Sequence, residues 1–219
     1  MKCKGAIFDM DGLLFDTEVI YQQTWNEIAK EKGIHLPKEF VKAISGTNGS
    51  TMCHVIETYY GVSNGSKIQV DCMARMKKKL DMYVPKKSGV DEILQFFKEN
   101  NVHLAVASSS GKSQIENNLK IAGIRTYFEK IISGTEVETG KPEPDIFLLA
   151  AEKIDCKPEE CYVFEDSLNG IQAGYRAGCK AIMIPDLIIP TEQMKNLSYG
   201  IYDTLTRALN RIRKDFAAD

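Results

Sequence analysis

Short apolar runs alternate with amphipathic stretches along most of this chain. Five of the runs have the length of buried strands and end in polar or glycine-containing turns: GAIFDMD, HLAVASSS, EKIISG, CYVFEDS and KAIMIPD. Between them lie stretches with apolar residues three or four apart: VDEILQFFKENN, QIENNLKIAGI, PDIFLLAAEKI and LNGIQAGYRAG. Strands that alternate with helices predict an α/β fold, a doubly wound parallel sheet with helices on both faces.

One connection is too long for this pattern. Roughly eighty residues separate the first run from the second, whereas a crossover helix needs only about a dozen. The extra stretch has helical periodicity interrupted by Gly, Pro, Asn and Ser. We therefore expect a Rossmann-like core made of residues 1–15 and 86–219, with an α-helical domain inserted over residues 16–85.

The composition excludes several classes of function. A formal charge of −2 on 219 residues provides no general field for nucleic acid or an anionic membrane. No stretch approaches the roughly 18 apolar residues of a membrane span, and the N-terminal apolar run is too short for a signal peptide. The six cysteines form no C-x-x-C pair, so a thiolate zinc site is not expected. We expect a cytoplasmic enzyme that acts on a small molecule.

Polar residues follow four of the predicted strands. In an open parallel sheet, ligands bind at the carboxyl ends of the strands, so these residues are expected to meet in one crevice. They are Asp9 and Asp11 after the first run, Ser108 and Ser109 after the second, Lys141 after the third, and Glu165 and Asp166 after the fourth.

Carboxylates gathered in one crevice repel one another unless a cation lies among them. Oxygen ligands favour a hard ion such as Mg²⁺, which usually completes its shell with water and a substrate phosphate. Mg²⁺ is therefore the expected cofactor. The expected ligands are Asp9, Asp11, Glu165 and Asp166.

A phosphoryl group bound there has a nucleophile beside it. We expect Asp9 to attack phosphorus and form an aspartyl-phosphate, which water then hydrolyses. Asp11 is the expected general acid and base. Lys141, the Ser108 hydroxyl and the backbone N–H of Ser109 are expected to hold the phosphoryl oxygens.

Four segments resemble known motifs: FDMDGLLFDT, ASSS, GKPEPDIF and FEDSLNGIQAGYRAG are similar, in order and spacing, to the four motifs of the haloacid dehalogenase superfamily. The helical insert resembles that superfamily's cap domain and indicates the branch of β-phosphoglucomutase and the sugar-phosphate phosphatases. The resemblance implies the same roles for the residues named above. It also implies a phosphoric monoester hydrolase whose substrate is a phosphorylated sugar, polyol or nucleoside.

A phosphomutase is the nearest alternative. It needs a second basic pocket for the phosphate that is not transferred, and the β-phosphoglucomutase pattern has an Arg after the glycine of the cap loop. Here Thr47, Asn48 and Gly49 follow Gly46. Arg75 or a nearby lysine is the remaining candidate for that anchor.

Two further alternatives are a dehalogenase, which does not need Asp11, and a non-catalytic module that binds phosphorylated metabolites, which would be expected to lack a motif residue. Neither agrees with the complete set of motif residues. Tyr21, Trp25 and Thr47 are the candidates for substrate contact within the insert. A monomer is the expected state.

Overall fold

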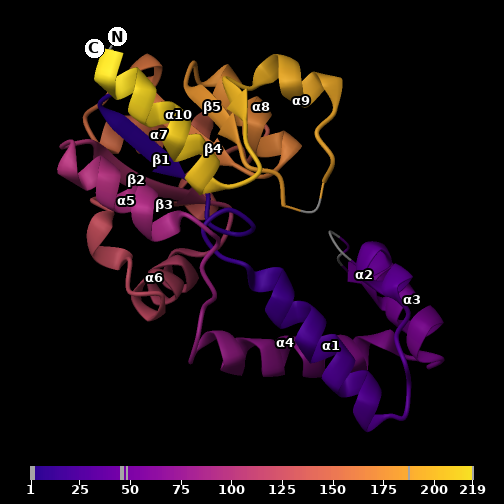
Figure 1. The fold of residues 1–219 in the computed structure, drawn as a ribbon. Helices are drawn as coiled ribbons and strands as arrows, with labels where there is room; N and C mark the ends of the chain where they lie inside the picture. Colours follow the sequence, from indigo (N-terminus) through magenta and orange to yellow (C-terminus); the bar gives the residue numbers. More distant parts are fainter. Residues whose placement is uncertain (1–2, 45–46, 48, 187, 219) are drawn as a thin grey trace. The chain divides into compact units, whose positions relative to one another are not determined.

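The computed structural model describes residues 3–44, 47, 49–186 and 188–218. The chain divides into two compact units (Figure 1). The larger unit comprises Met1–Asp16 and Pro85–Asp219, and the smaller unit is Thr17–Val84.

A parallel sheet forms the centre of the larger unit, with the strand order β3-β2-β1-β4-β5-β6. Its strands are β1 (Gly5–Phe8), β2 (His103–Ser108), β3 (Lys130–Ser133), β4 (Cys161–Glu165), β5 (Lys180–Met183) and β6 (Gly200–Ile201). The first five confirm the strands predicted from the apolar runs, and the predicted α/β fold is confirmed. The sixth was not predicted, because two residues are too few to produce a periodic pattern.

Helices cover both faces of this sheet (Figure 1). On one face, Ile7 of β1 packs in a cluster with Phe147 and Ala173, whereas on the other face the Phe8 ring lies 6.2 Å from that of Phe97. Successive side chains of a strand point to opposite faces, which is why neighbours in β1 join different halves of the core. The helices are α5 (Val90–Glu99), α6 (Lys112–Ile121), α7 (Asp145–Lys153), α8 (Leu168–Arg176), α9 (Glu192–Leu197) and α10 (Leu205–Ala218), with short 3-10 turns at Arg125–Tyr127, Gly134–Glu136 and Pro158–Glu160.

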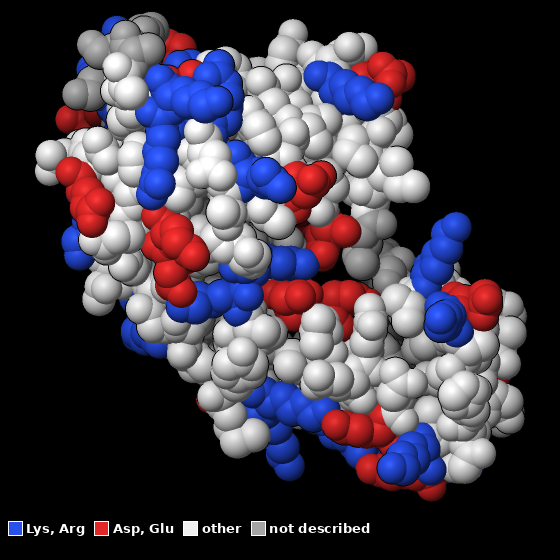
Figure 2. Space-filling model, viewed as in Figure 1, with Lys and Arg blue, Asp and Glu red and all other residues white. Residues whose placement is uncertain are grey.

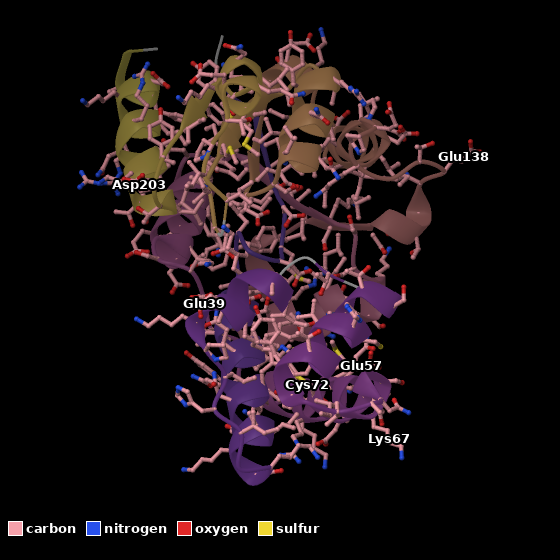
Figure 3. All side chains as sticks on the ribbon, turned by 90° about the vertical axis from the view of Figure 1, so that its right-hand side faces the viewer. Glu39, Glu57, Lys67, Cys72, Glu138 and Asp203 are labelled. Atoms are coloured by element: carbon pink, nitrogen blue, oxygen red, sulfur yellow. The ribbon has the colours of Figure 1, made fainter. Side chains whose placement is uncertain are left out.

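The smaller unit is helical and has its own core. Its helices are α1 (Thr17–Glu31), α2 (Lys38–Ile44), α3 (Gly49–Tyr60) and α4 (Gly65–Leu80). Trp25 is only 2% exposed and makes edge-to-face contacts with Phe40 and Tyr60. Cys72 is also fully buried in this core (Figure 3). The suggestion that Trp25 contacts substrate is therefore wrong, because its ring fills the interior of the helical unit.

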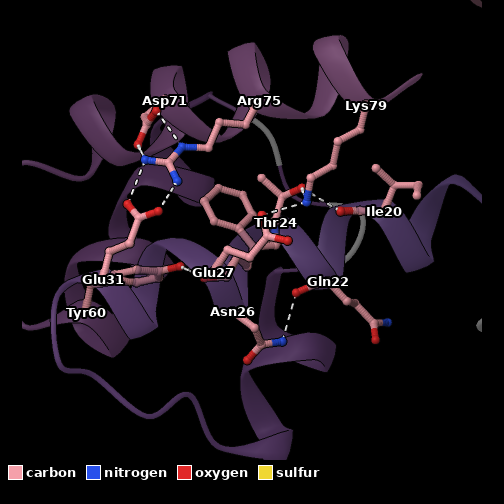
Figure 4. Close-up of polar contacts among 11 residues, drawn as sticks. Ile20, Gln22, Thr24, Asn26, Glu27, Glu31, Tyr60, Asp71, Arg75 and Lys79 are labelled. Atoms are coloured by element: carbon pink, nitrogen blue, oxygen red, sulfur yellow. Dashed lines mark hydrogen bonds and ion pairs between the residues drawn. The ribbon is translucent and has the colours of Figure 1, made fainter. Parts of the chain in front are cut away.

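Ion pairs join α1 to α4 inside the helical unit (Figure 4). Arg75 donates to both carboxylate oxygens of Glu31, at 2.5 and 2.8 Å, and to Asp71. Lys79 pairs with Glu27 at 2.6 Å. Arg75 therefore pairs with two acids of its own unit.

The chain enters and leaves the helical unit through two segments that pair with each other. The backbone N–H of Asp16 donates to the carbonyl oxygen of Pro85, that of Lys87 donates to Leu14 (both 2.9 Å), and Phe15 forms an antiparallel bridge with Lys86. We call residues 14–16 and 85–87 the root ribbon. Residues 16 and 85 were expected to belong to the insert, but this pairing places both in the larger unit.

Charges of both signs are interspersed over the face of the molecule seen in Figure 2. Lys77 and Lys78 of α4 are exposed, and Lys77 pairs with Asp81 at 2.9 Å. Among the described residues, no helix combines the length and the apolar character that crossing a membrane requires.

Candidate active site

The register of the central strands brings the predicted site residues together. Phe8, the last residue of β1, is paired with Val106 of β2 and Phe164 of β4. Asp9 comes next, and its backbone N–H donates to the carbonyl oxygen of Phe164 at 3.0 Å. Asp9 therefore stands at the carboxyl end of the sheet, level with Glu165 on the neighbouring strand.

Lys141 joins these two acids. Its ammonium lies 2.5 Å from Asp9 Oδ1 and 2.6 Å from Glu165 Oε1, and it also donates to the carbonyl oxygen of Ala107 at 3.2 Å. The three charged side chains are 7% (Lys141), 9% (Asp9) and 1% (Glu165) exposed. The structure thus brings together residues from three of the four predicted strand ends in a site that excludes most water.

The second oxygen of Glu165 accepts hydrogen bonds from the residues that lead into α8. Glu165 Oε2 accepts the backbone N–H groups of Asp166 (2.9 Å) and Ser167 (3.0 Å) and the Ser167 hydroxyl (2.9 Å). The unpaired N–H groups and positive dipole of a helix N-terminus favour a carboxylate at this place. Gly170 leaves room for it, since a Cβ there would lie 1.8 Å from the carboxyl carbon of Glu165. Glu165 is therefore held in one orientation.

Burial and neighbouring charges shift the pKa values of these groups in different directions. Burial raises the pKa of Asp9, although the nearby Lys141 works against this. Burial also raises the pKa of Asp166, and the charges of Glu165 and Asp9 add to the increase. For Glu165, the penalty of burial is outweighed by Lys141 and by hydrogen bonds, so its pKa is lowered. For Lys141, burial is likewise outweighed by the two acids, and its pKa is raised.

Three of the acids are close enough to share a cation. One carboxylate oxygen from each of Asp9, Glu165 and Asp166 lies within 4.8 Å of the other two, and this is the one such group found among the described residues. Lys141 carries one positive charge and cannot neutralise three carboxylates. Burial, together with the charges of neighbouring acids, raises the pKa of Asp9 and of Asp166. An all-oxygen donor set that lacks positive charge fits a hard divalent ion such as Mg²⁺.

Asp11 lies outside that group and has a different partner. Its Oδ2 accepts the hydroxyl of Ser110 at 2.8 Å, and burial raises its pKa. The backbone N–H of Ser110 donates to the buried Ser108 hydroxyl at 3.1 Å, and its carbonyl oxygen accepts the Ser133 hydroxyl at 2.7 Å. Ser109 is exposed. The sequence did not identify Ser110, because nothing in three consecutive serines indicates which one faces an acid.

Two residues beside Asp166 complete the site. Gly12 has a φ of +82°, and a Cβ on it would lie 2.3 Å from Asp166 Oδ2 and 3.4 Å from Asp186 Oδ2. A side chain at position 12 would therefore both strain the backbone and collide with Asp166. Asp186, which follows the fifth strand, was missed, although inspection of every strand end would have identified it.

The chain is similar to a known protein family and to named phosphatases. A family model described as haloacid dehalogenase-like hydrolase matches residues 6–184. The chain is 31% identical over 184 residues to the fructose-1-phosphate phosphatase YqaB of Escherichia coli, covering 81% of this chain and 94% of that protein. It is 29% identical over 180 residues to a phosphorylated carbohydrates phosphatase of Thermotoga maritima, covering 82% of this chain and 83% of that protein.

The fold has close counterparts among solved structures. A haloacid dehalogenase family hydrolase from Deinococcus radiodurans superposes with a TM-score of 0.81 at 24% identity, covering 99% of this chain and 96% of that chain. The family model spans most of the chain and confirms the resemblance drawn from the four motifs. This chain therefore belongs to the haloacid dehalogenase-like hydrolases.

Proposed function

We propose that the protein is a Mg²⁺-dependent phosphatase that hydrolyses a small phosphorylated metabolite through an aspartyl-phosphate on Asp9. The observation that carries this proposal is the buried cluster of Asp9, Lys141, Glu165 and Asp166 at one end of the sheet. Such a cluster presents a nucleophilic carboxylate, a cation for the phosphoryl oxygens and a set of metal ligands within one dry site.

In the first step, one oxygen of Asp9 attacks phosphorus and the bond between phosphorus and the ester oxygen breaks. The departing alkoxide takes a proton from Asp11. Burial favours the protonated form of Asp11, as its raised pKa indicates, and the Ser110 hydroxyl fixes the direction of its carboxyl group. Lys141 and the Ser108 hydroxyl hold phosphoryl oxygens while the charge shifts.

In the second step, Asp11 removes a proton from water, and the resulting hydroxide attacks the phosphorus of the aspartyl-phosphate. The bond between phosphorus and Asp9 breaks, which releases inorganic phosphate and regenerates the carboxylate. Asp11 is protonated again and ready for the next ester. Water is the final acceptor, so the reaction needs no co-substrate.

Asp9, Glu165 and Asp166 would hold the metal. Bound Mg²⁺ supplies the positive charge that lets an anionic carboxylate approach an anionic phosphate. Asp11 also stays a proposed ligand, although its carboxylate pairs with Ser110 in this structure.

We assign substrate selection to the helical unit. The named activities of the relatives, on fructose 1-phosphate and on phosphorylated carbohydrates, favour a phosphorylated sugar. Thr47 and Tyr21 remain candidates for contact. Thr47 donates its hydroxyl to the carbonyl oxygen of Ile44 at 2.7 Å, and Tyr21 donates to the sulfur of Met73 at 3.8 Å.

Arg75 does not support the alternative of a phosphomutase. Its guanidinium pairs with Glu31 and Asp71, so a free phosphate would have to displace two carboxylates to bind it. Lys77 and Lys79 also have acidic partners. The loop residues Gly46 and Asn48 lie outside the described residues.

A panel of sugar, polyol and nucleoside monophosphates, assayed with Mg²⁺ and with EDTA, tests the proposal. We expect release of inorganic phosphate that requires Mg²⁺ and a loss of at least about a thousandfold in kcat for Asp9→Asn. Asp203→Asn is the matched control, because Asp203 is exposed and follows β6 (Figure 3). Full turnover by Asp9→Asn, or isomerised sugar phosphate in place of free phosphate, would contradict it.

A further inference from the structure

Lys87 makes ion pairs that the proposed chemistry does not use. Its ammonium lies 2.5 Å from Asp186 Oδ1 and 3.3 Å from Asp16 Oδ1. The three side chains are partly buried. Asp16 ends the first segment of the root ribbon, Lys87 ends the second, and Asp186 belongs to the loop after β5. One ammonium thus joins three segments that are distant in sequence.

The Asp186 end of this network reaches the proposed metal site. A Cβ built on Gly12 would lie 2.3 Å from Asp166 Oδ2 and 3.4 Å from Asp186 Oδ2, so both carboxylates lie on the same side of the Gly12 backbone. Gly12 is one residue after Asp11, so both carboxylates lie against the loop of the general acid. A shift of Asp186 would therefore affect the positions of both Asp166 and the loop that carries Asp11.

At its other end, the network includes the root ribbon, which is hydrogen-bonded to the loop that carries Asp11. The backbone N–H groups of Leu14 and Phe15 donate to the carbonyl oxygen of Met10 at 3.0 and 3.2 Å, and that of Gly12 donates to Phe15 at 3.2 Å. Leu14 and Phe15 are fully buried. A displacement of the root ribbon would thus be transmitted to the loop that carries Asp9 and Asp11.

We propose that Lys87 is a positioning residue for the reaction. It ties the root ribbon to the loop after β5, and this tie holds the Asp11 loop and Asp166 at their working separation. The kinetic consequence of this proposal rests on the proposed phosphatase function, but the structural consequence does not.

Amide hydrogen exchange tests the structural consequence. We expect Lys87→Met to raise exchange at the amides of Asp16 and Lys87 by about tenfold, because the ribbon opens locally once its tie is lost. Lys86→Met is the matched control: Lys86 lies in the same ribbon and pairs with Asp91 at 2.6 Å, away from Asp186. Equal exchange in the two variants would overturn the proposal.

Kinetics with p-nitrophenyl phosphate and saturating Mg²⁺ test the effect on the reaction. We expect Lys87→Met and Asp186→Asn each to lower kcat by about tenfold with little change in KM, since misplaced catalytic groups weaken the transition state more than substrate binding. The double variant should be no worse than either single one, because both remove the same contact. Lys86→Met should retain the wild-type kcat.

The outcomes separate failure of this proposal from failure of the phosphatase assignment. If the wild-type protein releases no phosphate from any ester, the phosphatase assignment fails, and the exchange experiment alone decides the role of Lys87. If the wild-type protein is active, a kcat of Lys87→Met within about twofold of wild type overturns the proposal. Multiplying losses in the double variant would also overturn it.

Discussion

One set of ion pairs in each unit shows how differently paired charges are surrounded in this protein. In the larger unit, Lys141 and its two acids are each less than a tenth exposed. In the helical unit, Arg75 is 33% exposed and its partner Glu31 is 57% exposed. The Lys141 pairs are therefore shielded from water, whereas the Arg75–Glu31 pair lies within reach of it.

This difference in exposure predicts how much stability each unit loses when one partner of an ion pair is removed. A buried pair gains little net stability, because desolvation offsets the attraction, but a buried charge that loses its partner is costly. An exposed pair contributes little in either case. The buried charges around Lys141 are thus explained by chemistry at the site, whereas the core of the helical unit is apolar and includes Trp25, Phe40 and Tyr60.

Breaking one pair in each unit gives the largest expected effect. Lys141→Met leaves Asp9 and Glu165 without their shared cation, so we expect it to lower the free energy of unfolding by about 3–5 kcal/mol and to abolish turnover. Arg75→Met should change the unfolding midpoint only slightly and leave kcat near wild type. Urea unfolding in metal-free buffer, together with phosphate release in Mg²⁺, measures both. Equal destabilisation by the two variants would contradict the comparison.

A single hydrogen bond at the site gives a smaller effect. Ser110→Ala removes the hydroxyl that orients Asp11, and we expect kcat to fall by about tenfold while KM changes little, because general acid catalysis depends on orientation. Ser113→Ala on α6 is the control, since Ser113 is exposed. Steady-state kinetics would show whether kcat falls while KM stays nearly constant. A change confined to KM would instead indicate that Ser110 binds the substrate.

The smallest effect concerns pH and the exposed pair. The hydrogen bond from Arg75 lowers the pKa of Glu31, so this pair stabilises the folded form above the ordinary pKa of a glutamate. That contribution is lost as the pH falls through the lowered value. The small difference in unfolding midpoint between wild type and Arg75→Met should therefore be present at neutral pH and disappear in acid. A difference that persists in acid would show that the guanidinium acts through packing and not through charge.

Much of the candidate site could be predicted because its signals are local. Each apolar run ends where its strand ends, and residues after the ends of parallel strands lie at one edge of the sheet. That rule identified Asp9, Ser108, Lys141, Glu165 and Asp166 from the sequence. It fails for a two-residue strand such as β6, which has no period to detect.

By itself, then, the sequence determined the α/β alternation, the helical insert and the residues at four strand ends, because periodicity and turn chemistry belong to neighbouring residues. Only the tertiary structure decided that Lys141 lies between Asp9 and Glu165, that Ser110 faces Asp11, and that Trp25 lies in the core of the helical unit. It also decided that Lys87 meets Asp186. These pairings depend on strand register and on the paths of separate loops, which no local pattern encodes.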